Sequence, residues 1–298
     1  MSKEPEMTQT SHTFDPVAFK AGQRTGWDEA ARGWHEHAYI TDRNWGFIND
    51  RLIELAHVKP GDRVLDLASG IGDPALSMAR RVGPRGHVVA TDLSSSMLDI
   101  ARERATQLGL TNIDFHEMDA EAIDLSDRSF DAVVCRFGLM FLPDVLKGMR
   151  GIYRVLVPGG HLAAVTSRAP EPNVWAEWVF GPIQKALGVS GPPPPGTPGI
   201  FALGDPALIG RLLGKAGFTK IHAEVRSYVN DFESGEELAT WQFAINAPIK
   251  QMLARHSPEA KKAAWQAVAD SANRHADASG RVKVAGLNVE ISADRAPG

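Results

Sequence analysis

Between residues 60 and 168, short apolar runs alternate with longer stretches in which apolar positions recur every three or four residues. The short runs predict five strands, at 62–68, 86–93, 113–120, 130–137 and 161–167. The longer stretches predict helices over 74–82, 94–108 and 144–156. Strands that alternate with helices in this way form a parallel sheet covered on both faces. The pattern therefore predicts an α/β fold of the doubly wound type.

After residue 167 the alternation becomes less regular. The remaining chain predicts, in order, a helix, a stiff proline-rich connector, a second helix, a sixth strand, a mostly helical segment and a final strand or hairpin, at 175–188, 191–199, 205–218, 219–229, 236–278 and 280–293. No internal repeat accompanies these elements.

Composition limits the partners of this fold. The 298-residue chain is 43% apolar and 23% charged, with a formal net charge of -4, which is typical of a globular protein. This balance argues against nucleic acid as a partner. No apolar run of about 18 residues predicts a stable membrane insertion, and the polar N-terminus without a signal core leads us to expect a cytoplasmic location. The single cysteine, Cys135, excludes an internal disulfide and a cysteine metal cluster, and no metal site is expected.

The stretch "VLDLASGIGDPALSMA" at 64–79 joins a predicted strand, a glycine loop and a predicted helix. Glycines permit a tight turn and a close approach of ligand to backbone. A carboxylate flanks the loop on each side, Asp66 and Asp73, and Asp73 is expected to cap the helix that Pro74 begins. A pyrophosphate would rest on that helix terminus, where proline lacks an amide donor and aspartate repels it. The loop therefore disfavours a nicotinamide dinucleotide.

A ligand with a ribose, an adenine and a cationic sulfonium but no phosphate fits this loop better, and S-adenosylmethionine is such a ligand. Asp66 is expected to attract its cationic methionine part, directly or through a backbone or water contact. Asp92, at the end of the second predicted strand, can accept hydrogen bonds from both ribose hydroxyls. Asp119, at the end of the third, can accept the adenine amino hydrogens, and Met97 can pack on the adenine face. Ligands bind this edge of an open parallel sheet.

Four stretches, "VLDLASGIG", "VVATDLSSSML", "MDAEAIDLSDRSFDAVVCRFGLMFLPD" and "RVLVPGG", resemble successive signatures of the class I S-adenosylmethionine-dependent methyltransferases. The likeness covers roughly residues 60–167 and is to the branch of ubiquinone and menaquinone biosynthesis and related small-molecule enzymes. That family's loop often reads acidic-x-Gly-x-Gly-x-Gly, and Ala68 stands here in place of the first glycine. The resemblance implies a seven-stranded, mostly parallel sheet with an antiparallel last strand. It also implies that Arg136 lies beside the methionine part or the acceptor.

The same resemblance implies a single methyltransferase domain with an N-terminal helical lid and a helical insertion after the fifth strand. Its expected parts are a disordered tail, the lid helices, the cofactor-binding core, the acceptor-side insertion and the C-terminal part of the sheet with its own helical insertion, at 1–14, 15–58, 59–168, 169–204 and 205–298. The expected cofactor-binding residues are Asp66, Ala68, Gly70, Gly72, Asp92, Leu93, Met97, Asp119, Ala120 and Arg136, with Trp27 and Trp34 as further candidates.

Aromatic and histidine residues are concentrated at 26–46, before the first predicted strand. As the resemblance implies, this segment packs over the cofactor, where Trp27, Trp34 and Tyr39 are candidates to line the pocket; ordinary core packing is the alternative. The candidates for catalysis, without an assigned role, are His35, His37, Tyr39 and Arg136. The two histidines lie two positions apart and do not share a helix face, which argues against a metal held by the pair.

Methyl transfer from a sulfonium requires mainly an in-line arrangement of nucleophile, methyl carbon and sulfur, with water excluded. A general base is needed only when the nucleophile must lose a proton. The sequence therefore predicts methylation of a small, partly apolar acceptor, while the methylated atom and the oligomeric state stay open. Two alternatives also stay open: a non-catalytic binding protein with the same fold, and an NAD(P)-dependent oxidoreductase.

Overall fold

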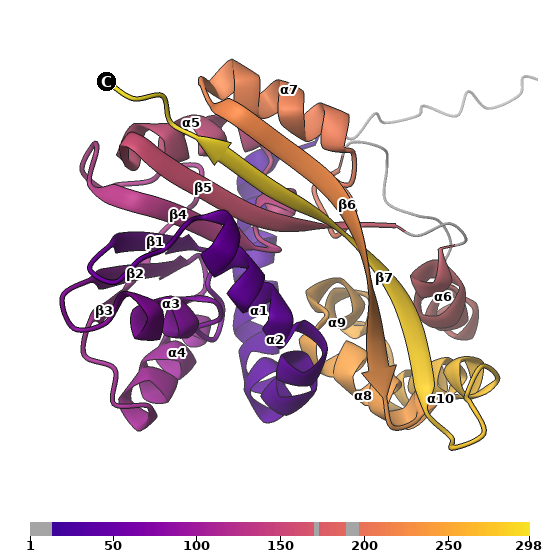
Figure 1. The fold of residues 1–298 in the computed structure, drawn as a ribbon. Helices are drawn as coiled ribbons and strands as arrows, with labels where there is room; N and C mark the ends of the chain where they lie inside the picture. The colour runs from indigo at the N-terminus through magenta and orange to yellow at the C-terminus, as the bar shows by residue number, and fades with distance from the viewer. Residues whose placement is uncertain (1–13, 170–172, 189–196) are drawn as a thin grey trace, which may run out of the picture.

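The computed structural model describes residues 14–169, 173–188 and 197–298. Its strands are β1 Arg63–Leu67, β2 His87–Asp92, β3 Ile113–Glu117, β4 Phe130–Arg136, β5 Leu156–Arg168, β6 Thr219–Phe232 and β7 Val282–Asp294. They form one seven-stranded sheet in the order β3-β2-β1-β4-β5-β7-β6 (Figure 1). The first five strands pair in parallel, and β7 is antiparallel to both β5 and β6. The predicted α/β sheet with a reversed last strand is confirmed.

The helices of the described residues cover both faces of this sheet and one end of it. They are α1 Pro16–Glu36, α2 Ala38–Leu55, α3 Ala75–Val82, α4 Ser95–Gln107, α5 Val145–Val155, α6 Gly181–Leu187, α7 Pro206–Ala216, α8 Gly235–Ile245, α9 Ala247–Leu253 and α10 Pro258–Asn273. Apolar side chains of α5 and α7 pack on one face, and those of α2 and α3 pack on the other. None of these helices is long and apolar enough to cross a membrane.

Most predicted strands appear within a residue or two of their expected bounds. The third is shorter than predicted, because β3 ends at Glu117 and leaves Asp119 in the following turn. The fifth strand is longer than predicted, because it begins directly after α5, where Leu156 pairs with Phe130 of β4. Residues 157–160, expected to end the helix, form an irregularity of the strand between these paired positions. The proline run at 192–195 and residues 1–13 of the expected tail lie outside the described residues.

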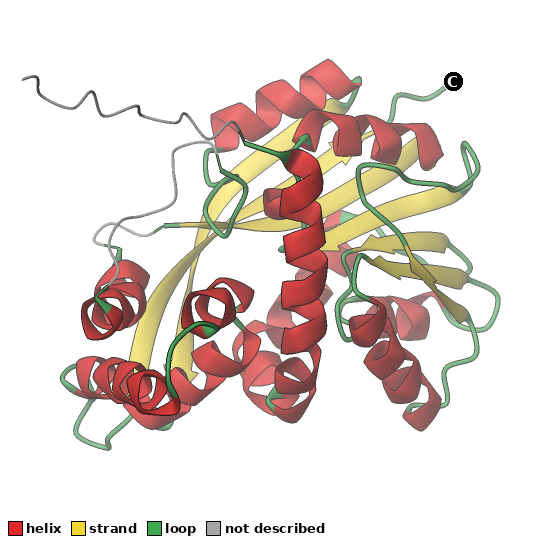
Figure 2. Cartoon of the chain, turned by 180° about the vertical axis from the view of Figure 1, so that it is seen from behind, coloured by secondary structure: helices red, strands yellow, loops and turns green. Residues whose placement is uncertain are grey.

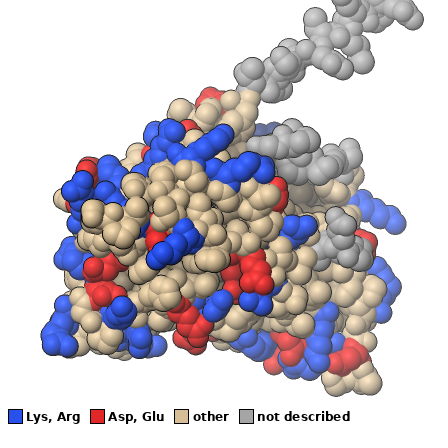
Figure 3. Space-filling view, turned by 45° about the horizontal axis from the view of Figure 1, so that its top comes forward, with Lys and Arg blue, Asp and Glu red and all other residues tan. Residues whose placement is uncertain are grey.

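Strands β6 and β7 extend as a two-stranded ribbon beyond the other strands (Figure 1). Their far ends pack with α8 and α10 in a separate hydrophobic core that includes Phe232, Trp241, Val268 and Val282. The parallel part of the sheet and the far helices therefore have separate hydrophobic cores. On the face drawn in Figure 3, basic and acidic side chains are interspersed with neutral surface.

Helix α1 lies between the parallel part of the sheet and the far helices. It contacts α4 on one side and α8 and α9 on the other (Figure 2). Asp15 caps it by accepting hydrogen bonds from the amides of Val17 and Ala18. The approach to α8 is close at Gly33, where a Cβ atom would collide with the carbonyl group of Ala244 and lie 2.8 Å from its carbon. The absence of a side chain at this position therefore sets how closely α1 packs on α8.

We expect Gly33→Ala to lower the free energy of unfolding by about 1–3 kcal/mol, because the obstructing atoms are backbone and cannot rotate away. Gly22→Ala is the matched control, since nothing lies within 4 Å of a Cβ atom at that position of the same helix. The control should raise stability by about 0.5–1 kcal/mol through helix propensity. Urea denaturation measures both changes, and equal effects of the two substitutions would contradict the close packing of α1 on α8.

Candidate functional site

A cavity of about 250 Å³ lies at the carboxyl edge of the parallel strands. Residues at or just past the ends of β1 to β5 line it, together with side chains of α1, α8 and the segment after β5. It brings together most of the residues expected from the sequence to bind a cofactor: Trp27, Trp34, Ala68, Gly70, Asp92, Leu93, Met97, Asp119, Ala120 and Arg136.

Five predicted site residues do not line the cavity: Asp66, Gly72, His35, His37 and Tyr39. Asp66 is fully buried inside β1, so of the contacts expected from the sequence the direct one does not fit, and one through the backbone or a water stays a prediction. Tyr39 is 61% exposed and His35 is also on the surface, because both project outward where α1 gives way to α2. Of the candidates for catalysis, only Arg136 lines the cavity. Across the described ranges, no three His, Cys, Asp or Glu side chains gather in a way that would hold a metal ion.

The carboxylate of Asp92 holds the glycine loop against the end of β2. Its Oδ2 accepts a hydrogen bond from the Gly70 amide at 2.8 Å, and its Oδ1 accepts one from the Ser94 amide at 2.9 Å. A second loop amide, that of Gly72, donates to the carbonyl oxygen of Ser69 at 2.9 Å. Each Asp92 oxygen keeps acceptor capacity for one further donor. Burial raises the pKa of Asp92, while hydrogen bonds from backbone amides lower it.

The expected role of Asp73 as a helix cap is wrong. Helix α3 begins after Pro74 without a side-chain cap, and Asp73 instead pairs with Arg104 of α4 at 2.7 Å. The same guanidinium donates to the carbonyl oxygen of Ile71 at 2.6 Å. Because this arginine offsets the charge of Asp73, the acidic residues beside the loop do not by themselves create a site for a cation.

Beneath the loop lies a buried group of polar side chains. Burial raises the pKa of the Asp66 carboxyl well above its usual value, an effect that the charge of Arg136 and a hydrogen bond from the backbone amide of Ala75 oppose. Burial also lowers the pKa of Arg136, whose Nη1 donates to Asn49 Oδ1 at 2.9 Å. Asp66 therefore faces the protein interior and the start of α3 rather than the cavity.

Helix α1 is held across the cavity by polar contacts that the sequence analysis did not identify. Lys20 Nζ lies 2.6 Å from Asp119 Oδ2 and 2.6 Å from Glu121 Oε2. One turn further along the helix Arg24 pairs with Glu117, and one more turn along Asp28 accepts a hydrogen bond from Ser94 Oγ at 2.5 Å. Lys20, Arg24 and Asp28 follow one another at intervals of four residues, which places them on one helix face. This spacing was the sequence signal that could have indicated a polar contact face on α1. Asp119 thus forms an ion pair with Lys20 and also lines the cavity.

Two buried polar atoms in the cavity wall, Ser69 Oγ and Gln23 Oε1, have no hydrogen-bond partner among the described residues. Their residues are 2% and 9% exposed. Buried polar atoms normally find a partner, and leaving one without costs about 1–3 kcal/mol. A ligand with both donors and acceptors would satisfy them. The adenosyl part of S-adenosylmethionine has both, so the residues present fit this group.

The rest of the wall is mainly aromatic and comes from β4, the segment after β5, β6 and helices α1 and α2. The ring residues that line the cavity are Trp27, Trp34, Trp45, Phe137, Phe141, Trp175, Phe180, Phe201 and Tyr228. Three of them, Trp175, Phe180 and Phe201, lie within 169–204, where the sequence predicts an acceptor-side insertion but no individual residues, and Tyr228 lies in β6. Their positions depend on long-range packing that the local pattern does not record.

Residues 41–178 match the model of the ubiE/COQ5 methyltransferase family. A ubiquinone/menaquinone biosynthesis C-methyltransferase of Xanthomonas oryzae is 40% identical over 197 residues, which are 61% of this chain and 73% of that one. A demethylmenaquinone methyltransferase of Listeria monocytogenes is 38% identical over 42% of this chain and 53% of its own length. Across the first such relatives, the matches span little more than half of their length.

Solved structures share the fold at low sequence identity. A phosphoethanolamine N-methyltransferase of Haemonchus contortus, crystallised with S-adenosyl-L-methionine, has a TM-score of 0.58 at 21% identity over 96% of this chain and 61% of that one. The [4+2]-cyclase SpnF has a TM-score of 0.52 at 22% identity over 84% of this chain and 80% of that one. The names of these two proteins describe different reactions, so the fold alone does not define the chemistry.

Ala68 takes the place of a glycine and has a backbone φ of 56°, in the left-handed region. A residue with a Cβ atom costs about 1–2 kcal/mol in that conformation. We therefore expect Ala68→Gly to raise the free energy of unfolding by about 1 kcal/mol. Ala79→Gly, at a buried helical position of α3, is the control and should lower it by about 1 kcal/mol or more. A loss of stability in Ala68→Gly, measured by urea denaturation, would argue against the strained turn.

The raised pKa of Asp66 gives a pH dependence whose sign is defined. Between its ordinary and its raised pKa, the folded protein holds a proton that the unfolded chain has released, so stability falls as pH rises through this window. Asp66→Asn should remove that dependence. The variant should then gain stability relative to the original protein as the pH rises above the ordinary pKa of an aspartate. A relative loss over the same range would show that the carboxylate is charged and held by Arg136.

Proposed function

Because the chain belongs to the ubiE/COQ5 methyltransferase family, we propose that it transfers a methyl group from S-adenosylmethionine to a small, partly apolar acceptor. The observation that carries the proposal is the Asp92 carboxylate, which stands in the cavity wall at the end of β2 with acceptor capacity on both oxygens. A ribose diol is a pair of donors at matching spacing. The unpartnered atoms of Ser69 and Gln23 lie in the same wall.

When bound, S-adenosylmethionine supplies a methyl group on a positively charged sulfur, which is transferred by in-line displacement. The chain's own residues bind the cofactor and orient it. Asp92 accepts hydrogen bonds from the ribose, Met97 and Ile71 give an apolar surface for the base, and α1 covers the cavity and excludes water. Lys20 keeps Asp119 and Glu121 in place and leaves Asp119 Oδ1 and Oδ2 each with one protein donor.

The acceptor that we propose is of the quinone-precursor type, methylated on carbon. Relatives at 38–42% identity are named for demethylmenaquinone and for ubiquinone and menaquinone C-methylation. The aromatic wall suits a flat apolar molecule of this kind. Transfer of labelled methyl from S-adenosylmethionine to a demethylated naphthoquinol tests this directly. Cofactor binding without transfer to any of a panel of phenols, quinols and thiols would favour the non-catalytic alternative.

The glycine loop also bears on the oxidoreductase alternative. A pyrophosphate would need amides that the protein already uses, since that of Gly70 binds Asp92 and that of Gly72 binds Ser69. Pro74 contributes no amide at the start of α3. These contacts, rather than the charge of Asp73, support the preference for a ligand without phosphate.

Asp92→Ala should weaken binding of S-adenosylhomocysteine by about 1.5–3 kcal/mol, or about 10- to 100-fold in Kd, because charge-assisted hydrogen bonds to the ribose are lost. The substitution also frees two loop amides, so a control must separate binding from stability. Ser257→Ala removes the cap of α10, away from the cavity, at a cost of about 1 kcal/mol in stability, and keeps the carboxylate. Titration calorimetry should find near-normal affinity in Ser257→Ala. Equal losses in both variants would assign Asp92 a structural role only.

A further inference from the structure

Two of the tryptophans in the cavity wall, Trp34 and Trp45, have indole nitrogens that are bound within the protein. Trp34 Nε1 donates to the carbonyl oxygen of Ile245 at 3.0 Å, and Trp45 Nε1 donates to Asn230 Oδ1 at 3.0 Å. These two rings stand 6.2 Å apart and present apolar surface to the same cavity. Both contact α8, since Trp45 packs on Trp241 and Trp34 binds Ile245. The two rings therefore lie directly beside α8 in the cavity wall.

Gln242 and Asn246, one turn apart on α8 and at its end, line the cavity beside these rings. The backbone amide of Ile249 can only donate, and it donates to Asn246 Oδ1 at 3.3 Å. This contact turns the amide nitrogen of Asn246 toward Gln242 Oε1, which accepts from it at 3.1 Å. The amide nitrogen of Gln242 is left with two hydrogens and no partner in the described part of the chain. A fixed backbone donor thus determines that Gln242 presents a donor to the cavity.

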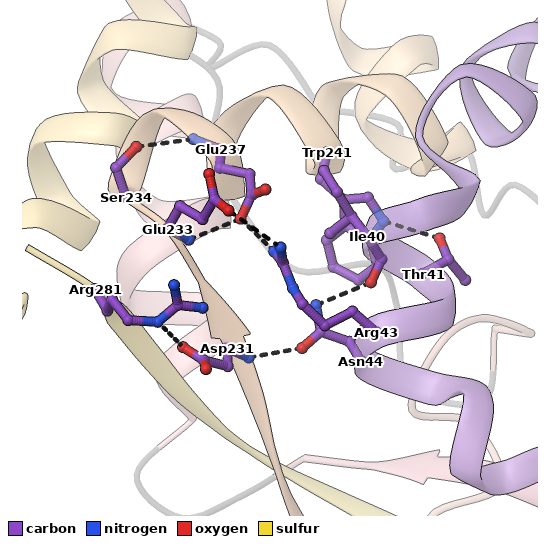
Figure 4. Close-up of polar contacts among 10 residues, drawn as sticks. All are labelled: Ile40, Thr41, Arg43, Asn44, Asp231, Glu233, Ser234, Glu237, Trp241 and Arg281. Atoms are coloured by element: carbon purple, nitrogen blue, oxygen red, sulfur yellow. Dashed lines mark hydrogen bonds and ion pairs between the residues drawn. The ribbon is translucent and has the colours of Figure 1, made fainter.

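Helix α8 holds this donor rigidly. Figure 4 shows α8 joined to α2 through Trp241 Nε1, which donates to Thr41 Oγ1 at 3.1 Å, and through the ion pair of Arg43 with Glu237. Trp241 is completely buried, and Gln242 is only 7% exposed. The amide nitrogen of Gln242 is not among the fully buried unpartnered atoms, so it is accessible from the cavity that the residue lines, where a ligand oxygen can accept from it.

The wall on this side offers no base. Among the described residues from Phe137 onward that line the cavity, there is no carboxylate and no histidine. Burial raises the pKa of Tyr228 to about 12, so this phenol stays protonated. The charged group is Arg168, whose Nη1 donates to the carbonyl oxygen of Gly204 at 3.1 Å. Donors and a cation recognise an oxygen that carries lone pairs or negative charge.

We propose that Gln242 is a specificity-determining residue that donates a hydrogen bond to a carbonyl or phenolate oxygen on a flat apolar acceptor, and that Asn246 is the residue that positions it. The inference rests on the proposed function. It goes beyond the family resemblance, because both residues lie outside the stretch 41–178 that matches the family model. The oxygen is held by these donors, and no side chain of this wall removes a proton from the acceptor.

Two substitutions of equal shape test the donor. Gln242→Glu replaces it with a carboxylate oxygen. Asn246→Asp keeps the cap of α9, since aspartate caps as well as asparagine, but can no longer donate to Gln242 Oε1, so the Gln242 amide turns over. Gln266→Glu makes the same charge change at an exposed position of α10 and is the matched control.

The probes are 1,4-naphthoquinone and 1,4-dimethylnaphthalene, which share a shape but differ in their two oxygens. Equilibrium dialysis against the full chain saturated with S-adenosylhomocysteine measures their affinity. The original protein and Gln266→Glu should prefer the quinone, and both cavity variants should lose about tenfold in quinone affinity with no change for the hydrocarbon.

Three outcomes would overturn the role of Gln242: no preference of the original protein for the quinone, unchanged quinone affinity in the two cavity variants, or equal losses for both probes. Binding of S-adenosylhomocysteine, measured separately, distinguishes these outcomes from a failure of the proposed function. If that ligand binds and the quinone preference is absent, only the assignment of Gln242 is wrong.

Discussion

The hydrogen bond from the Gly70 amide to the Asp92 carboxylate is the contact on which the site depends. It joins the loop after β1 to the end of β2, and the second oxygen of the same carboxylate fixes the start of α4 through Ser94. The loop amide is thereby used inside the protein, while the carboxylate keeps acceptor capacity toward the cavity. Because the Gly70 amide donates to Asp92, it is not available to a phosphate. The same contact holds the Asp92 carboxylate where its remaining lone pairs can accept from a diol. A glycine loop of this kind therefore suits an adenosyl group without phosphate.

The local pattern of the sequence was sufficient for the sheet and for the edge at which ligands bind. Period and run length place a strand before Asp92 and another before Arg136, and parallel connectivity brings such residues to one edge. The pattern failed where the partner lies far away in the chain. Asp73 has the sequence signature of a cap, yet Arg104 binds it from 31 residues further on. Asp66 has the family's acidic position but lies fully inside β1, because a strand buried on both faces hides its side chains.

The wall that we propose for the acceptor was hardest to predict, because the donors it presents depend on hydrogen-bond direction rather than residue type. Nothing in the mostly helical segment 236–278 marks Gln242 as different from a surface glutamine. The available signal was the sequence Asn246, Ala247, Pro248, which is typical of a helix start and implies that the asparagine oxygen faces the backbone. Because the Asn246 oxygen accepts from the backbone, its amide nitrogen faces Gln242 Oε1, and this contact fixes the orientation of the Gln242 amide. Lys20 and its carboxylate partners were missed for a similar reason, since α1 meets β3 only in the folded chain.

The central claim is that this loop and carboxylate select an adenosyl ligand without phosphate. Titration calorimetry on the purified chain, with S-adenosylhomocysteine and NADH in parallel, tests it most directly. The account predicts saturable binding of one S-adenosylhomocysteine per chain and no detectable heat with NADH. Binding of NADH together with no uptake of S-adenosylhomocysteine would contradict it.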